Sequence, residues 1–161
     1  MRRRGGAGLD YLSAPTGPIA AAQAAAAAAF GADVTFLLVN GTTVGLHAAV
    51  LATCRPGDAV VLARNCHMSA SSACVLAGCH PVWVDPALDA RLGVAHGVTP
   101  EALEQGFEAA AAAGLRASAA LLVSPTYFGA CSDVAGAESC LAVVTGRACE
   151  PARSGPPVTC R

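Results

Sequence analysis

The 161-residue sequence contains no lysine, and all ten of its basic residues are arginine. This absence excludes every chemistry that needs a lysine of this chain, such as a Schiff base, a P-loop lysine or a lysine general base. Charged residues make up only 13% of the sequence and the net charge is −1, so no electric field favours nucleic acid or an anionic membrane as a partner. Aromatic residues make up only 4%, and alanine supplies much of the 54% hydrophobic content.

Long hydrophobic runs are also missing. Residues 19–29 are nearly all alanine, a stretch too short and too weakly apolar to span a bilayer. The arginines at positions 2–4 imitate the start of a signal peptide, but Asp10 and Pro15 interrupt the apolar region that should follow. We therefore expect no membrane partner, and a location in the cytoplasm or a plastid rather than secretion.

The sequence has eight cysteines but no Cys-x-x-Cys pair, the spacing most typical of zinc or redox sites. Cys66 and Cys79 each precede a histidine directly, yet neighbours on a strand point to opposite faces and rarely share an ion. We expect no metal site. The cysteines are interpreted as small buried thiols in a reducing compartment.

Apolar runs alternate with helix-like segments along the chain. Thr99 and Pro100, for example, have the typical pattern of a helix start, with a capping threonine and a proline at the first position. Strands that alternate with helices indicate right-handed βαβ units. The sequence thus predicts an α/β fold, a partial parallel sheet with helices on both faces. The expected strands are 35–39, 59–63, 81–85 and 119–123, and the expected helices are 19–29, 43–54, 67–77 and 100–113.

The organised part of the sequence runs from residue 9 to residue 136. We expect residues 1–8 to be disordered. Residues 137–161 end without an apolar period, and we interpret them as a divergent, disordered tail. A four-stranded parallel sheet that ends before this tail leaves at least one edge bare.

A first candidate site, Asn40-Gly41-Thr42-Thr43, stands between an expected strand and an expected helix. A glycine lets the backbone approach a ligand closely, and the N–H groups at a helix start attract phosphate. The two threonine hydroxyls add hydrogen-bond donors. The segment predicts a phosphate-binding turn, and it also fits an ordinary turn in which a threonine caps the helix.

Two further candidates follow strand ends, where α/β sheets bind ligands. His67 follows the second expected strand, where an imidazole suits stacking on a flat ligand or acid–base work; it also fits a surface or helix-capping histidine. Thr126 and Tyr127 follow the last expected strand, and their hydroxyls suit a ligand. The alternative is a turn with Tyr127 packed in the core.

The remaining histidines and the tryptophan have structural interpretations. His47 stands among small apolar helix residues, which favours a packed histidine. Trp83 lies in the middle of an expected strand and is expected in the core. His80 and His96 have no evident partner. The sequence has no dinucleotide fingerprint, no P-loop and no serine-hydrolase elbow.

Six segments of the chain share one order and spacing with a known family. They are Leu9–Ile19 (LDYLSAPTGPI), Ala29–Asp33 (AFGAD), Leu38–Thr43 (LVNGTT), Arg64–His67 (RNCH), Gly97–Glu101 (GVTPE) and Pro125–Gly129 (PTYFG). Each is weak alone, but together they resemble the ornithine/lysine/arginine decarboxylase family over residues 9–136. The resemblance implies a pyridoxal-phosphate enzyme with the aspartate-aminotransferase type of fold, of which this chain holds an incomplete large domain.

The resemblance implies roles for the residues already singled out. Gly41–Thr43 match the turn that holds the phosphate of pyridoxal phosphate, and His67 matches the histidine that stacks on its pyridine ring. Thr126 and Tyr127 match a strand-end motif beside the cofactor. The implied substrate is a basic amino acid, and the implied partners are a second copy of the chain or a full-length subunit.

The chain also departs from the family's pattern. Met68 stands where the family usually has lysine after the histidine. The aspartate that pairs with the pyridinium nitrogen, the Ser-x-His-Lys motif with the Schiff-base lysine, an early Pro-Gly-His-Lys segment and the small domain are all missing. We therefore expect no catalytic residue here, and interpret the chain as a truncated family member that is inactive alone, because the cofactor needs an amine.

Two alternatives stay open. The chain fits a non-enzymatic remnant that binds the cofactor phosphate or pairs with a full-length subunit through a bare sheet edge. It also fits a fragment of another enzyme of the same fold type, such as an aldolase or a desulfurase. Asn65–His67 together with Pro125–Tyr127 favours the decarboxylases.

Overall fold

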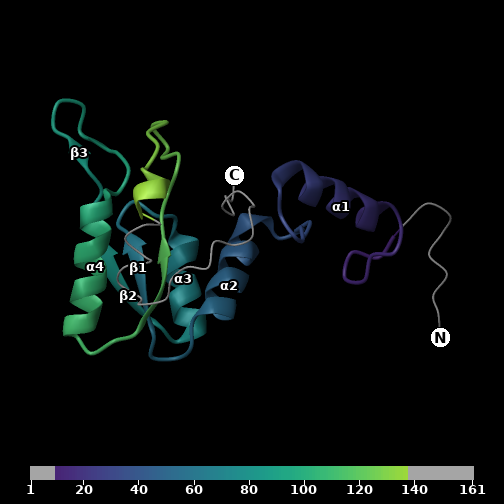
Figure 1. Ribbon diagram of the computed structural model, residues 1–161, viewed down its shortest axis with the longest axis horizontal. Coiled ribbons are helices and arrows are strands. Elements are labelled where there is room, and N and C mark those ends of the chain that lie inside the picture. The colour runs from purple at the N-terminus through teal and green to yellow at the C-terminus, as the bar shows by residue number, and fades with distance from the viewer. Residues whose placement is uncertain (1–9, 138–161) are drawn as a thin grey trace. The chain divides into compact units, whose positions relative to one another are not determined.

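The computed structural model describes residues 10–137, and these divide into two compact units between Val39 and Asn40. Residues 10–39 contain one helix, and residues 40–137 contain the sheet and every candidate site residue. Figure 1 draws the helices and strands of both units. The expected disorder of residues 1–8 and nearly all of the expected tail, 138–161, lie outside the described residues.

The carboxylate of Asp10 organises the first unit. Its two oxygens accept hydrogen bonds of 2.8–3.0 Å from four backbone N–H groups, at the point where helix α1 (Pro18–Phe30) begins. These bonds, above all the one from Thr16, favour the charged carboxylate and lower the pKa of Asp10 to about 2. The four donors are Tyr11, Thr16, Gly17 and Ile19.

The predicted helix at 19–29 is confirmed, but the predicted strand at 35–39 is wrong. Thr35–Leu38 have no regular secondary structure, and the neighbouring side chains of Val34 and Val39 are 64% and 79% exposed. An apolar run becomes a strand only where a neighbouring strand accepts and donates its backbone hydrogen bonds. Within the described residues no strand pairs with this segment.

The second unit is built on a parallel sheet of three strands, one fewer than expected. Strand β1 (Ala59–Ala63) is buried along its whole length and lies in the centre, between β2 (His80–Val84) and β5 (Ala117–Leu121). The three remaining predicted strands are therefore confirmed, with bounds shifted by up to two residues. β5 begins early because its first residue already pairs with the first residue of β1.

Helices cover both faces of this sheet, as predicted. Helices α2 (Gly41–Thr53) and α3 (Met68–Ala77) pack on one face, and α4 (Pro100–Ala112) packs on the other (Figure 1). A short antiparallel hairpin, β3 (Leu88–Asp89) with β4 (Val94–Ala95), connects β2 to α4. No helix within residues 10–137 combines the length and the apolarity needed to cross a membrane.

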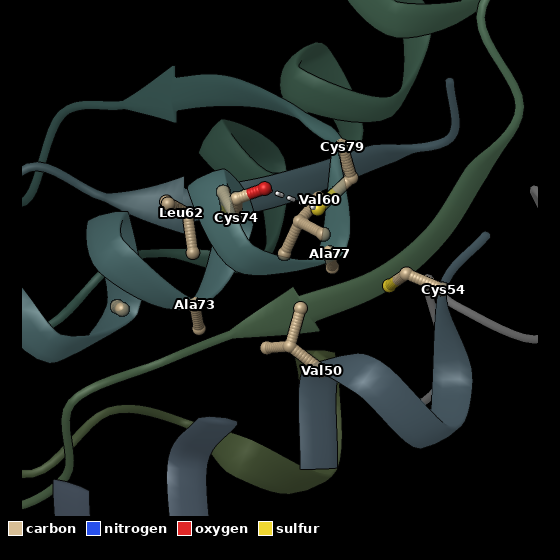
Figure 2. Close-up of a cluster of buried hydrophobic side chains, with 9 residues drawn as sticks. Val50, Cys54, Val60, Leu62, Ala73, Cys74, Ala77 and Cys79 are labelled. Atoms are coloured by element: carbon tan, nitrogen blue, oxygen red, sulfur yellow. Dashed lines mark hydrogen bonds between the residues drawn. The ribbon is translucent and has the colours of Figure 1, made fainter. Parts of the chain in front are cut away.

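The core on the α2–α3 face consists of small side chains. Three alanines of α3 pack there against Val60 and Leu62 of β1, and three cysteine thiols are buried in the same cluster (Figure 2). Burial and neighbouring thiols raise the pKa of Cys74 to about 12, so this thiol is inert. The alanines are Ala70, Ala73 and Ala77, and the buried cysteines are Cys54, Cys74 and Cys79.

Helix α4 approaches the sheet closely on the other face. A Cβ atom at Gly106 would lie 2.6 Å from a methyl group of Val84 and 2.8 Å from one of Val61. Leu103 and Phe107, on the same side of the helix, are fully buried against the sheet. The absence of a side chain at Gly106 thus permits the close contact between α4 and two strands.

Trp83 is not a core residue, contrary to the sequence prediction. Its register partner Leu62 is fully buried, whereas Trp83 is 42% exposed. β2 lies at the edge of the described sheet, so a large side chain there is covered from one side only.

Candidate functional site

The starts of helices α2 and α3 lie at the same edge of the sheet. α2 precedes β1 in the chain and runs back along the sheet in Figure 1, while α3 follows β1 at its carboxyl end. Both helix starts therefore lie where β1 ends, and Figure 1 shows the segment after β5 at this end of the sheet as well. The three segments that contain the six predicted site residues thus lie at the carboxyl edge of the sheet.

The start of α2 lacks a side-chain cap. The N-cap position is Asn40, and its side chain makes no capping hydrogen bond. Gly41 has φ +69°, a left-handed conformation that favours glycine, and nothing lies within 4 Å of the place where a Cβ would stand. Thr42 and Thr43 are exposed and have no hydroxyl partner within residues 10–137. The alternative of a threonine N-cap is therefore wrong, and the first N–H groups of α2 have no side-chain acceptor in the described chain.

His67 is the N-cap of α3, which was one of its two sequence interpretations. Its Nδ1 accepts a hydrogen bond from the backbone N–H of Ser69 at 3.1 Å, and the Ser69 hydroxyl lies 2.8 Å from the same nitrogen. The residue as a whole is exposed. Capping therefore uses one nitrogen of the ring and leaves the imidazole accessible at the sheet edge.

Thr126 and Tyr127 differ in their surroundings. Thr126 is only 7% exposed, and its hydroxyl oxygen accepts a hydrogen bond from the N–H of Ala130 at 3.3 Å within a tight turn. Tyr127 is 84% exposed, so the alternative of a tyrosine packed in the core is wrong. Of this pair, only Tyr127 presents its hydroxyl to solvent, while Thr126 shapes the turn that carries it.

Sequence reasoning missed two contacts that connect the loops at this edge. Arg64, after β1, forms an ion pair of 2.9 Å with Asp85, after β2. Asn65 donates from its side-chain nitrogen to the backbone carbonyl of His96 at 3.1 Å. The sequence indicates the Arg64–Asp85 pair, because these opposite charges directly follow two neighbouring parallel strands. No local pattern indicates the hydrogen bond from Asn65 to His96, because its partners are 31 residues apart.

A small cavity of about 230 Å³ lies between the start of α4 and the segment 131–133. It is lined by none of the predicted site residues and is smaller than typical ligand pockets. His96, on its wall, has a partner after all, because its Nε2 lies 3.7 Å from the carboxylate of Asp89. His80 is exposed, and the packed interpretation of His47 agrees with the burial of its Nε2.

The opposite, amino edge of the sheet carries a structural ion pair. The carboxylate of Asp58, before β1, accepts hydrogen bonds of 3.0 and 2.6 Å from the guanidinium of Arg116, before β5. The Ser118 hydroxyl and the N–H of Arg55 also donate to it, at 2.7 and 2.8 Å. Arg116, followed by the other donors, holds the pKa of Asp58 well below its usual range. This cluster ties the starts of two strands together and lies away from the candidate site.

Within residues 10–137, no three histidine, cysteine, aspartate or glutamate side chains are grouped so as to hold a metal ion. The cysteines described there are all unbridged. The six predicted site residues at the carboxyl edge offer backbone N–H groups, hydroxyls and an imidazole to a ligand.

The described residues form an α/β fold that a solved aminotransferase shares. The structure of a DegT DnrJ EryC1 StrS aminotransferase from Brucella abortus matches with a TM-score of 0.61. The match covers 81% of this chain and 33% of the aminotransferase chain. Its sequence identity is 22%, so this likeness concerns the fold alone.

The sequence comparisons give the family. The model for "Orn/Lys/Arg decarboxylase, major domain" matches residues 5–146. An arginine decarboxylase of Bacillus subtilis (strain 168) is 42% identical over 127 residues, which are 78% of this chain and 25% of the relative. The structure of the constitutive lysine decarboxylase of E. coli matches with a TM-score of 0.55 and 26% identity, over 70% of this chain and 16% of that one. The chain belongs to the Orn/Lys/Arg decarboxylase family and spans about a quarter of the length of the arginine decarboxylase relative.

Proposed function

We propose that this chain provides the cofactor-phosphate site of a pyridoxal-phosphate-dependent decarboxylase of basic amino acids, and that the 161 residues alone do not catalyse turnover. The observation that carries the proposal is the uncapped start of α2, with two exposed threonines, at the sheet edge that also carries His67. The family domain in this proposal spans residues 9–136. The substrate class comes from relatives that are arginine and lysine decarboxylases.

The residues at this edge fit the phosphate group. The left-handed Gly41 keeps Cβ bulk away from the turn, and the N–H groups of the first helical turn attract an anion. The hydroxyls of Thr42 and Thr43 are exposed and available as further donors. Together these groups recognise phosphate without a cationic side chain, which suits a chain without lysine.

The ring of the cofactor fits beside His67 and Tyr127. In this proposal the imidazole face of His67 lies against the pyridine ring, and the exposed hydroxyl of Tyr127 stands beside it. Bound pyridoxal phosphate supplies the electron sink for loss of an amino acid's carboxylate. The chain's own residues bind and orient the cofactor, but none has a side-chain amine to carry it, because lysine is absent.

A binding experiment tests the first half of the proposal. The purified chain is titrated with pyridoxine 5′-phosphate, which has no aldehyde and so does not react with the amino terminus, and binding is measured by calorimetry. Removing both hydroxyls in Thr42→Ala/Thr43→Ala weakens binding by about tenfold or more, because hydrogen bonds to a charged group are lost. His67→Ala also weakens it.

Matched controls separate binding from folding. Thr53→Ala removes a hydroxyl at the far end of the same helix, where it donates to the Ala49 carbonyl at 2.8 Å, and leaves binding unchanged. His80→Ala removes an exposed histidine at the start of β2, at the opposite edge, with the same result. Equal affinity of the wild type and the Thr42→Ala/Thr43→Ala variant for pyridoxine 5′-phosphate contradicts the proposed phosphate site.

A second experiment tests turnover. The chain is mixed with pyridoxal phosphate and arginine, lysine or ornithine, and carbon dioxide release is followed. We expect the rate of the free cofactor and no more, because no lysine carries the cofactor. A rate well above that background, abolished in the Thr42→Ala/His67→Ala variant, contradicts the proposed inactivity.

A further inference from the structure

Ser69 is the one side chain in the described residues that holds the ring of His67. Its hydroxyl oxygen lies 2.8 Å from Nδ1, and its backbone N–H points to the same nitrogen at 3.1 Å. Ser69 itself is 2% exposed, so its hydroxyl is fixed inside the helix–sheet contact. No other acceptor competes for this hydroxyl in the described part of the chain.

These two contacts favour one hydrogen position on the imidazole. A backbone N–H only donates, so Nδ1 acts as an acceptor and carries no hydrogen in this arrangement. The Ser69 hydroxyl must then donate to Nδ1 as well. In the neutral ring this arrangement places the hydrogen on Nε2, the nitrogen that does not cap the helix.

The buried position of Ser69 makes this contact rigid. The residue directly after it, Ala70, is fully buried against β1, and Ala73 packs in the same cluster one turn further on. The hydroxyl thus acts from a part of α3 that the core holds in place.

We propose that Ser69 is a positioning residue, which favours the Nε2–H form of the His67 ring and holds the ring in one plane, so that one face of it is presented to the pyridine ring of the cofactor. The inference rests on the proposed function, because it concerns the same site. It goes beyond that function by assigning the orientation of His67 to a buried hydroxyl two residues away that does not touch the cofactor.

The test uses three variants of the full chain. Ser69→Ala removes only the oxygen, and alanine is the best helix former, so α3 is retained. Ser69→Thr keeps a hydroxyl at the same place. Ser72→Ala is the matched control, because its hydroxyl lies one turn later in α3 and donates to the Met68 carbonyl at 2.9 Å rather than to His67.

The first measurement is ¹⁵N NMR of the imidazole nitrogens, recorded in mildly alkaline buffer so that the two neutral ring forms can be compared. His67→Ala identifies the His67 signals among those of the four histidines. We expect the Nε2–H pattern in the wild type and in Ser72→Ala. In Ser69→Ala only the 3.1 Å hydrogen bond from the backbone N–H still favours this form. We therefore expect the two nitrogen shifts to move toward each other as the Nδ1–H form gains population, and Ser69→Thr to restore their separation.

The second measurement is the affinity for pyridoxine 5′-phosphate. We expect Ser69→Ala to lose about threefold to tenfold in affinity, the effect of one net hydrogen bond, while Ser69→Thr and Ser72→Ala bind like the wild type. Circular dichroism confirms that each variant is folded.

The two measurements keep the failure of this inference apart from the failure of the proposed function. Unchanged His67 shifts in a folded Ser69→Ala overturn the role of Ser69, whatever the affinity. A folded Ser69→Thr that does not restore the shift separation overturns it too. Absence of binding by the wild type contradicts the proposed function, whereas the NMR result still decides whether Ser69 sets the ring.

Discussion

At the scale of single residues, the carboxylate of Asp58 is held by hydrogen bonds from three other residues. It receives four hydrogen bonds, two of them from one guanidinium, and these favour its charged form. Its pKa is therefore lowered in the folded state relative to the unfolded state. A lowered carboxyl pKa stabilises the fold fully above the ordinary aspartate value of about 3.9, and this stabilisation is lost as the pH falls through the folded value.

We expect Asp58→Asn to be less stable than the wild type near neutral pH, because Arg116 loses its charged partner. The difference should narrow as the pH falls from about 5 to about 2, since the unfolded wild type then binds a proton at Asp58 that the folded protein does not yet bind. Urea unfolding at a series of pH values measures it. Glu108→Gln, at an exposed position of α4 in the same unit, serves as the control and shows no such narrowing. A pH-independent difference would show that the charge is irrelevant.

Some of these residues can be identified from the sequence, whereas the contacts of others cannot. Gly41 and His67 are identifiable because each follows or precedes a regular element, so their place at the sheet edge depends on local pattern. The hold of Ser69 on His67 is not identifiable, because a serine two residues after a histidine occurs in many contexts. Asp58 and Arg116 are paired only once the register of β1 and β5 is known.

At the scale of elements, the close contact of α4 with the sheet predicts that replacing a helical glycine by alanine lowers the stability of the protein. Glycine to alanine inside a helix normally stabilises it by about 1 kcal/mol. At Gly106 the added Cβ would lie within 3 Å of Val84 and Val61, so we expect Gly106→Ala to destabilise the protein by about 1–3 kcal/mol. Thermal unfolding measures the change.

Gln105→Ala is the control for this prediction. It places the same side chain on the exposed side of α4, next in sequence, where it meets no strand. We expect a change within about 0.5 kcal/mol of the wild type. A Gly106→Ala variant as stable as Gln105→Ala would mean that α4 packs further from β1 and β2.

Elements were predictable to the extent that their signals are local. α1 begins at Pro18 and ends at the left-handed Gly31, and α4 begins after Thr99, whose hydroxyl accepts from Ala102, all of which the sequence indicates. A strand depends on a partner elsewhere in the chain. The apolar run 35–39 was predicted without knowledge of any partner, and for that reason it failed.

At the scale of the whole molecule, hydrogen exchange distinguishes the two kinds of apolar segment. β1 is buried along its length and paired on both sides, so its amides should exchange most slowly among residues 10–137. The amides of Thr35–Leu38 should exchange rapidly, because they form no strand. Mass spectrometry of peptic peptides measures both. Equal protection of the two segments would mean that 35–39 pairs as a strand in solution.

The alanine face of α3 has a consequence for the height of His67 above the sheet. Ala70, Ala73 and Ala77 put methyl groups between the helix and β1, beside the buried thiol of Cys74, so these small side chains set the thickness of the layer. His67 stands three residues before the first of them, at the very start of the helix. Valine or leucine at position 70 would push that end of α3 away from β1 and move the imidazole outward with it. The smallest side chains of the core thus act as spacers for the ring at the surface.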